Sequence, residues 1–393
     1  MAKTIFKIHS TVAIALFVCS TAVAQTWNIG SPNAADVTAT LSGGTLTISG
    51  SGAMRDWTYD GSPWYSQRAG ITTVVINDGV TTIGSFAFHD NSSLTSVTIP
   101  GSVTGIGQSA FAYCSGLTSV IIPGNVTSIA GSAFEGCSGL TSIIIPGSVT
   151  SIGEKSFEGC SKLTGIAVDA ANAWYSSIDS VVYNKNQDSL LICPRGKQQD
   201  TFIIPNSVTC IGRYAFYYCS SLSSVAIPGS VTSIEQSAFQ GCSGLTSVAI
   251  PGSVTSIGSS AFSACSYLTS VAIPGGVTSI ESSAFSYCIG LASVIIPGSV
   301  TSIEYGAFQD CSSLVAITSL NSVPPNADDA FFGLNTSNCT LTVSICALPD
   351  YQKDTVWNKF GRIVADTSLP CSDPNAAIEE PEISLHEDAQ YKY

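Results

Sequence analysis

Phenylalanine recurs in this chain at a fixed interval of 23 residues. Ten phenylalanines keep one phase, and only the interval from Phe157 to Phe216 is longer, at 59 residues. The ten are Phe88, Phe111, Phe134, Phe157, Phe216, Phe239, Phe262, Phe285, Phe308 and Phe331. A unit of this length cannot bury its apolar face alone, so neighbouring copies must stack around a continuous core. The sequence therefore predicts a repeat solenoid.

One copy, residues 117–139 (LTSVIIPGNVTSIAGSAFEGCSG), shows how the unit is divided. It begins with alternating, largely β-branched residues, which predict a short strand with one face inward. Pro123 and Gly124 follow, and Pro-Gly predicts a type II turn with the glycine in the left-handed region. Apolar residues between 126 and 137 supply the rest of the buried face. The fold class is thus a β-rich solenoid of 23-residue units.

The full pattern, L-x-x-V-x-I-P-x-x-V-x-x-I-x-x-x-A-F-x-x-C-x-x, resembles the BspA-like (Treponema pallidum type) leucine-rich repeat of secreted and surface proteins. The match covers about residues 71–335. As in that subclass, Pro follows the strand and Phe lies on the outer side of the unit. The resemblance implies a curved solenoid with a role in adhesion, whereas the period alone implies only the solenoid.

The first 24 residues are typical of a secretory signal peptide. Two lysines precede an apolar run, and small residues at 22–24 form a cleavage site, so we expect cleavage near Ala24 and a secreted or cell-surface protein. Acylation of Cys19, as in a lipoprotein, is the alternative, but bulky residues at 17–18 disfavour it. Beyond residue 24 no apolar run approaches the ~20 residues of a membrane span, so no membrane insertion is expected.

The segments on either side of the repeats are predicted to cap them, because a solenoid needs atypical end units to cover its last apolar faces. Residues 25–70 are expected to form a β cap with a hairpin over 37–48, centred on Ser-Gly-Gly. Residues 336–365 are expected to close the other end with a strand over 339–345 and a short helix over 350–360.

The long interval between Phe157 and Phe216 holds an irregular insert at about residues 169–200. Two β-rich runs, Ser180–Tyr183 and Leu190–Cys193, flank a polar segment and predict a hairpin. Insertions into repeats often carry recognition. The alternative is an enlarged repeat that only bends the stack, and the presence of such an insert in the resembled family slightly favours it.

The chain is acidic and sparsely charged. Its net charge is −13, charged residues make up 10% of it, and no Lys or Arg lies between Arg213 and Lys353. A surface without cations cannot neutralise a phosphate backbone, so nucleic acid and anionic membranes are not expected as partners. Residues 366–393 hold seven acidic residues and one lysine, which predicts an acidic disordered tail.

Eight of the fourteen cysteines occupy one repeat position. Residues in one row of a stack point the same way, which disfavours disulfides between them, and neither CxxC pairs nor histidine partners accompany them, so buried free thiols are expected. These eight are Cys114, Cys137, Cys160, Cys219, Cys242, Cys265, Cys288 and Cys311. Flanking copies place Asn91 and Leu334 there, which indicates a small buried apolar site. One or two disulfides are possible among the cysteines outside the row, with no pairing favoured by spacing: Cys193, Cys210, Cys339, Cys346 and Cys371.

The catalytic groups are few. After signal-peptide cleavage only His89 and His386 remain, and nothing near His89 resembles a nucleophile elbow. Glu281 and Glu304 share one position on adjacent copies, where like charges can raise a pKa or hold a cation, but exposed solubilising charge is the simpler interpretation. We expect no enzyme activity, no cofactor and no metal site.

The outward strand positions form rows of small hydroxyl and aliphatic residues. Such a long uncharged surface is suited to an extended protein or glycan, although small β-branched residues also simply favour sheet. The predicted ligand-surface residues are Thr118, Ser119, Ile121, Thr141, Ser142, Ile144, Thr246, Ser247, Thr269 and Ser270.

Together these features predict a secreted or cell-surface leucine-rich repeat binding protein. The predicted role is that of an adhesin-like module for host or partner-cell proteins or glycans. The alternative is a passive scaffold of the periplasm or cell envelope with no dedicated ligand. The threonine rows also faintly resemble ice-binding faces, which the expected curvature and the serine and alanine substitutions disfavour.

Overall fold

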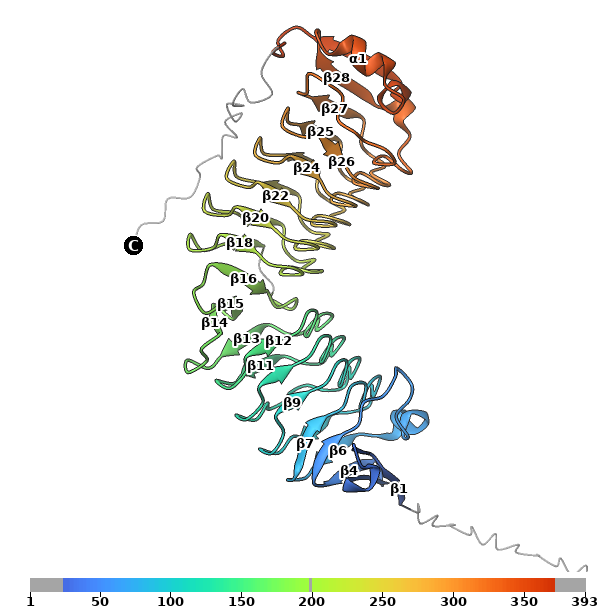
Figure 1. The fold of residues 1–393 in the computed structure, drawn as a ribbon, viewed down its shortest axis with the longest axis vertical. Coiled ribbons are helices and arrows are strands. Elements are labelled where there is room, and N and C mark those ends of the chain that lie inside the picture. Colours follow the sequence, from blue (N-terminus) through green and yellow to red (C-terminus); the bar gives the residue numbers. More distant parts are fainter. Residues whose placement is uncertain (1–23, 198–199, 372–393) are drawn as a thin grey trace, which may run out of the picture.

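The computed structural model describes residues 24–197 and 200–371 as a long stack of coils (Figure 1). The repeat solenoid predicted from the 23-residue period is confirmed, because strand partners lie 23 residues apart, as in Ser224 with Ser247. Two halves of the stack are inclined to each other at the level of the insert (Figure 1). The predicted signal peptide, except Ala24, and the predicted tail beyond residue 371 lie outside the described residues.

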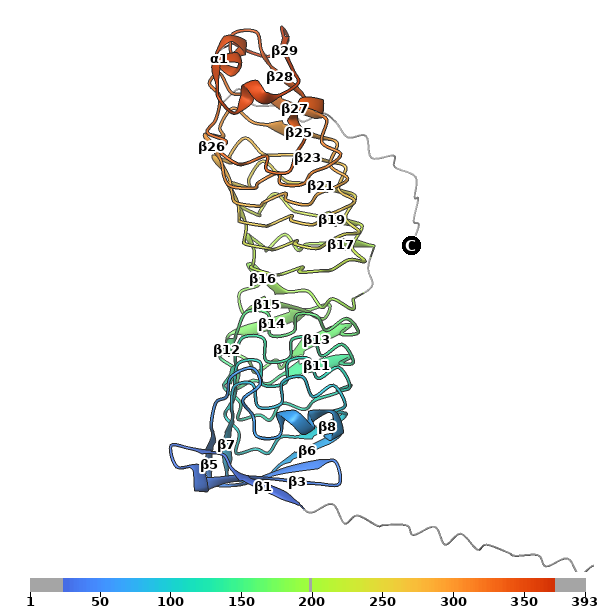
Figure 2. The ribbon, with the colours of Figure 1, turned by 90° about the vertical axis from the view of Figure 1, so that its right-hand side faces the viewer.

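Parallel strands stack in two columns along opposite sides of the coils (Figure 2). The first column contains β4 (Thr45–Gly50), β6 (Thr73–Ile76), β8 (Ser96–Thr98), β11 (Ser142–Ile145), β13 (Gly165–Val168), β17 (Thr201–Ile203), β19 (Ser224–Ala226), β21 (Ser247–Ala249), β23 (Ser270–Ala272), β25 (Ser293–Ile296) and β27 (Ala316–Ser319). The second contains β5 (Gly52–Met54), β7 (Val80–Ile83), β9 (Gly105–Ile106), β10 (Ser128–Ile129), β12 (Ser151–Ile152), β18 (Cys210–Ile211), β20 (Ser233–Ile234), β22 (Ser256–Ile257), β24 (Ser279–Ile280) and β26 (Ser302–Ile303).

The ten phenylalanines form a buried column between the strand columns, interrupted once. Their rings stack nearly parallel, as in Phe262 on Phe285, with centroids 5.5 Å apart and planes 1° apart. Burial of one such side chain is worth about 1.5–3 kcal/mol. Because each coil contacts only its neighbours, the stability of the stack is approximately the sum of the stabilities of the single coils and of the contacts between adjacent coils.

The prediction of type II Pro-Gly turns was wrong. The N–H of Val126 donates to the carbonyl of Pro123 at 3.1 Å, so Pro123 is the first residue of the turn and Gly124 the second. Gly124 has no left-handed φ. The left-handed residues lie instead two positions before and two after each phenylalanine, as Ser132 and Gly136 do around Phe134. Pro-Gly can stand at the first and second residues of a turn or at its second and third residues, so the dipeptide alone does not fix the register of the turn.

The N-terminal cap is a small β sheet with one buried tryptophan. Strands β1 (Gln25–Asn28), β2 (Gly30–Ser31) and β3 (Val37–Ser42) precede β4, and β3 and β4 form the predicted hairpin. Trp64 stacks on Phe88 at 5.9 Å, and its indole N–H donates to the carbonyl of Ala87 at 2.9 Å. Trp64 therefore covers the first ring of the phenylalanine column.

The C-terminal cap also covers its end of the column with a tryptophan. It comprises the predicted strand as β28 (Thr340–Ser344), helix α1 (Leu348–Lys353), a 3-10 turn at Trp357–Lys359, and β29 (Arg362–Asp366), which the sequence did not indicate. Trp357 packs edge-on against Phe331 at 5.4 Å. The predicted helix is therefore shorter than expected and is followed by a separate turn.

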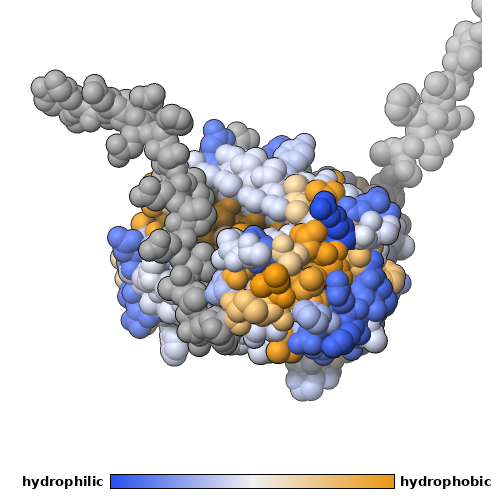
Figure 3. Space-filling model, turned by 90° about the horizontal axis from the view of Figure 1, so that it is seen from above, coloured by the Kyte–Doolittle hydropathy of each residue, from blue (hydrophilic) through white to orange (hydrophobic). Residues whose placement is uncertain are grey.

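One disulfide, Cys346–Cys371, ties the end of the described chain to this cap. Apolar surface remains exposed at this end beside hydrophilic residues (Figure 3). Among the described residues, no helix has the length and apolarity of a membrane span.

Candidate functional site

Backbone hydrogen bonds join each regular coil to the next around its phenylalanine. The N–H groups of the phenylalanine and of the residues two before and two after it donate to carbonyls of the following coil. Around Phe134 the three N···O distances are 2.9, 3.0 and 2.7 Å. The left-handed residues at the two flanking positions place these N–H groups on one side, as in the anion-binding concavities called nests. In a regular coil this side is filled by the next coil.

The hydrogen-bond ladder stops at Phe157. The N–H groups of Lys155, Phe157 and Gly159 have no acceptor among residues 24–197 and 200–371. Phe157 stacks on Phe134 at 5.7 Å, but no described aromatic ring covers its other side. After the insert the column resumes at Phe216, and the ring of Phe202 covers this end edge-on at a centroid distance of 5.1 Å. Of the four column ends, Phe157 is thus the one without an aromatic cover in the described chain.

The insert explains the interruption. It forms a meander of β14 (Tyr175–Ile178), β15 (Val181–Asn184) and β16 (Ser189–Ile192), so the predicted hairpin is confirmed and has one further strand. Strand β16 pairs with β18 and continues the second strand column. None of the described residues of the insert accepts a hydrogen bond from the N–H groups of Lys155, Phe157 and Gly159. The hydrophobic core is accordingly split here, with Val182 in one cluster and Val181 in the other.

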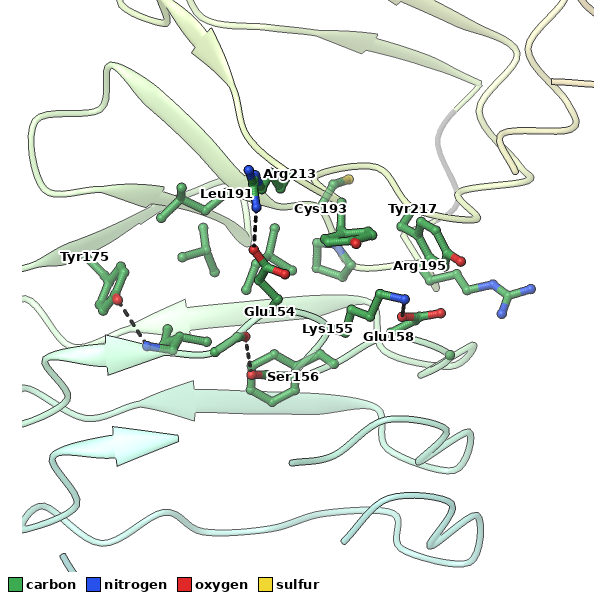
Figure 4. Close-up of a pocket in the computed structure, with 18 residues that line it drawn as sticks. Glu154, Lys155, Ser156, Glu158, Tyr175, Leu191, Cys193, Arg195, Arg213 and Tyr217 are labelled. Carbon is green, nitrogen blue, oxygen red and sulfur yellow. Dashed lines mark hydrogen bonds and ion pairs between the residues drawn. The ribbon is translucent and has the colours of Figure 1, made fainter. Parts of the chain in front are cut away.

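A cleft of about 350 Å³ occupies the place of the missing turn (Figure 4). Its floor is residues 152–159, and its opposite wall comprises residues 191–195 with Arg213, Tyr214 and Tyr217. That wall presents two carbonyls, those of Arg213 and Tyr217, which accept from no donor in the described ranges. The cleft therefore has unpaired N–H donors on one side and unpaired carbonyl acceptors on the other.

Three cationic side chains line this cleft. Lys155 lies over the ring of Tyr214 at 4.8 Å, while Arg195 lies over Tyr218 at 5.5 Å. Arg213 spans the cleft to Glu154, with Nη1 and Oε1 3.2 Å apart (Figure 4). Both partners of this ion pair are more than half exposed, so the pair is weak and free to rearrange.

A second carboxylate, Glu158, lies deeper in the cleft. Its Oε2 is 3.5 Å from Nζ of Lys155 and has no hydrogen-bond partner among the described residues. Burial raises the pKa of Glu158, an effect that the charge of Lys155 opposes. Formally the lining carries three cations and two carboxylates, within a protein of net charge −13.

The sequence contained a signal for this site that the sequence analysis did not use. Every Lys and Arg between Arg68 and Lys353 falls within residues 155–213. These six are Lys155, Lys162, Lys185, Arg195, Lys197 and Arg213. The cations of the repeat region are therefore confined to the insert and the two coils that border it.

All ten predicted ligand-surface residues are exposed on the strand face. They form two groups, residues 118–144 and 246–270, with the insert between them. The hydroxyls of Thr141, Thr246 and Thr269 donate to backbone carbonyls one coil earlier at 3.2–3.4 Å. The donor capacity of these three hydroxyls is thus already used. The two predicted isoleucines present exposed apolar surface, Ile121 at 84% and Ile144 at 64%.

The eight repeat-position cysteines are buried free thiols that also make hydrogen bonds. Cys242 donates its thiol to the carbonyl of Phe216 at 3.0 Å, and the same bond recurs along the regular coils. Burial raises the pKa of the Cys265 thiol to about 12. These buried thiols are therefore structural and chemically inert.

The remaining predicted candidates do not assemble into a catalytic or metal site. His89 is buried against the rings of Tyr59 and Tyr113 near the N-terminal cap. Glu281 and Glu304 lie on adjacent coils and neither lines the cleft. Within the described ranges, no group of three or more His, Cys, Asp or Glu side chains is placed to hold a metal ion.

The coil geometry and the paired strand columns define a leucine-rich repeat solenoid. A family model described as the BspA-type leucine-rich repeat region, built of six copies, matches residues 61–186, 195–315 and 278–352. These matches cover more than half of the chain, which therefore belongs to the BspA-type leucine-rich repeat family. No curated protein shows a significant match to the sequence.

Solved structures of bacterial leucine-rich repeat proteins share the fold. A leucine-rich repeat protein from Eubacterium ventriosum is 28% identical, with 86% of this chain and 93% of that chain covered and a TM-score of 0.68. A leucine-rich cell surface protein from Faecalibacterium prausnitzii is 29% identical, with 72% and 93% covered and a TM-score of 0.52. The pneumococcal vaccine antigen PcpA, 17% identical over 84% and 97% of the chains, has a TM-score of 0.66 and shows the fold alone.

Proposed function

We propose that this protein is a secreted or cell-surface binding protein of the adhesin type, which recognises proteins or glycans of a host or partner cell. The observation that carries the proposal is the strand face, where exposed hydroxyl-bearing residues recur along the coils. Exposed isoleucines lie in the same face at positions 121, 144, 203 and 295. Many weak, equally spaced contacts along such a face add up to useful affinity for an extended partner. Membership of a family of surface repeat proteins and the similarity to a leucine-rich cell surface protein support the same conclusion.

The isoleucine row offers the direct test. The double variant Ile121→Lys and Ile144→Lys places two charges on the strand face, where both side chains are exposed. Ser151→Lys and Ser256→Lys, exposed on the second strand column, form the matched control with the same added charge. Retention of residues 25–371 on immobilised matrix proteins, mucin and partner-cell extracts is the measurement.

We expect the strand-face variant to lose at least about tenfold in retention, since two lysines must be desolvated at the contact, and the control to be unchanged. Loss in both variants, or no retention of the unmodified protein, would contradict the proposal and favour a passive scaffold. Protease treatment of intact cells tests the location separately, because a periplasmic protein would be protected while a surface protein is cleaved.

A further inference from the structure

We propose that the cleft beside Phe157 binds an acidic sugar, with the sugar carboxylate on the unpaired N–H groups of Lys155, Phe157 and Gly159. The inference rests on the proposed function for the source of the sugar, an extracellular glycan. It concerns a different surface from the strand face, so the two proposals can fail independently.

The floor of the cleft is built like an anion site. Lys155 and Gly159 have left-handed φ values of 61° and 72°. In regular coils, left-handed residues at these two positions place the three N–H groups on one side, toward carbonyl acceptors. Here the acceptors are absent from the described residues, so these donors line the cleft without a protein partner. A carboxylate supplies two oxygens to these donors and gains charge-assisted hydrogen bonds from them.

The cations around the floor indicate that the ligand is negatively charged. Lys155 on the floor and Arg195 on the opposite wall are half-buried, and Arg213 reaches across the cleft to Glu154. The two carboxylates of the lining are already near cations, Glu154 with Arg213 and Glu158 with Lys155. The N–H dipoles and these cationic side chains would repel a cationic ligand, which excludes cations as ligands of the cleft.

The other end of the phenylalanine column provides an internal comparison. At Phe331 the corresponding N–H groups, those of Asp329, Phe331 and Gly333, also lack acceptors in the described chain. There Trp357 covers the ring, and the neighbouring side chains are acidic, as at Asp310. Within residues 24–197 and 200–371, unpaired donors coincide with cations and an open cavity only at Phe157.

The opposite wall favours a sugar over a simple anion. The free carbonyls of Arg213 and Tyr217 require donors, which sugar hydroxyls supply and a sulfate ion does not. Tyr214 and Tyr217 contribute half-buried rings whose centroids are 5.4 Å apart. Lys155 lies over both rings, so a sugar ring packs its C–H face against the ring surface that Lys155 leaves uncovered. A volume of about 350 Å³ is at the lower end of ligand sites, which suits one or two sugar residues.

The test uses three probes on the purified protein: a glucuronate-containing disaccharide, its methyl ester, and inorganic sulfate. Titration calorimetry should show the acid binding at least about tenfold more tightly than the ester, because the ester loses its charge-assisted hydrogen bonds. The acid should also bind more tightly than sulfate. Equal affinities of acid and ester would overturn the anion site, and equal affinities of acid and sulfate would overturn the sugar assignment.

Variants locate the site. Lys155→Gln and Arg195→Gln should each weaken binding of the acid about tenfold, whereas Lys162→Gln, an exposed cation of the same region outside the cleft lining, should leave it unchanged. Equal losses in all three would indicate nonspecific attraction and contradict the proposal.

Amide chemical shifts of the unmodified protein give a readout that does not depend on the folding of a variant. On titration with the acid, the amides of Lys155, Phe157 and Gly159 should shift, while those around Phe134, already bonded to the next coil, should not. Shifts elsewhere with none at these three would overturn the assignment. Binding of the acid without retention on cell extracts would refute the proposed function alone, and retention without binding would refute this inference alone.

Discussion

A regular coil and the coil that ends at Phe157 have the same sequence pattern but different surroundings. In the regular coil the N–H groups of the phenylalanine and of the residues two before and two after it meet carbonyls of the next coil, and the ring lies between two other rings. At Phe157 the next coil is replaced by the β14–β16 meander, which continues one strand column and leaves the phenylalanine side open. Repetition therefore supplies a long face, and its interruption supplies a concave, charged site.

The largest expected effect is on the free energy of unfolding, when a ring inside the column or the ring at its open end is removed. Phe262→Ala should cost about 4 kcal/mol in unfolding free energy, because it removes a fully buried ring with neighbours on both sides. Phe157→Ala should cost about half as much, since this ring has one aromatic neighbour and borders the cleft. Denaturant titration measures both. Equal losses would show that the open end is packed as tightly as the interior.

Because the core is split, we expect a destabilising substitution to affect only the half of the stack that contains it. In Phe262→Ala, hydrogen exchange should become faster in β17 to β27 and remain unchanged in β7 to β13, because the two hydrophobic clusters meet only at the insert and coils stabilise their neighbours. Peptide-resolved exchange followed by mass spectrometry makes the comparison. Faster exchange throughout would mean that the meander couples the halves fully.

The sequence was a good guide to what repeats and a poor guide to what is missing. Period and phase predicted the solenoid, and strand alternation predicted the insert hairpin, because both depend on which side chains are buried. The donors of the cleft are unpaired backbone N–H groups, such as those of Lys155 and Phe157, and no side-chain pattern encodes them. The hydrogen bonds of the thiols were not predicted for a related reason. Leu334 at the same repeat position indicated an apolar site, although in most coils the cysteine at this position donates to a carbonyl.

A smaller effect separates two members of the cysteine row. Cys242 donates to the carbonyl of Phe216 at 3.0 Å, whereas Cys219, the first after the insert, reaches only the carbonyl of Cys193 at 3.8 Å. The truncation to alanine removes the same atoms at both sites. Cys242→Ala should therefore cost about 1 kcal/mol more than Cys219→Ala, the worth of one net hydrogen bond. Thermal unfolding of the two variants side by side provides the check, and equal costs would mean that the thiol acts only as an apolar filler.

The smallest expected effect concerns the one ion pair that crosses the cleft. Arg213 and Glu154 come from the two halves of the stack, yet their side chains are 55% and 58% exposed. Water and salt screen such a pair, so Arg213→Gln should cost less than about 1 kcal/mol, and raising the salt concentration should reduce that cost further. Denaturant titration at low and high salt tests both points. A larger, salt-independent loss would mean that Arg213 holds the halves together, whereas a negligible one leaves its guanidinium free to turn toward an anion in the cleft.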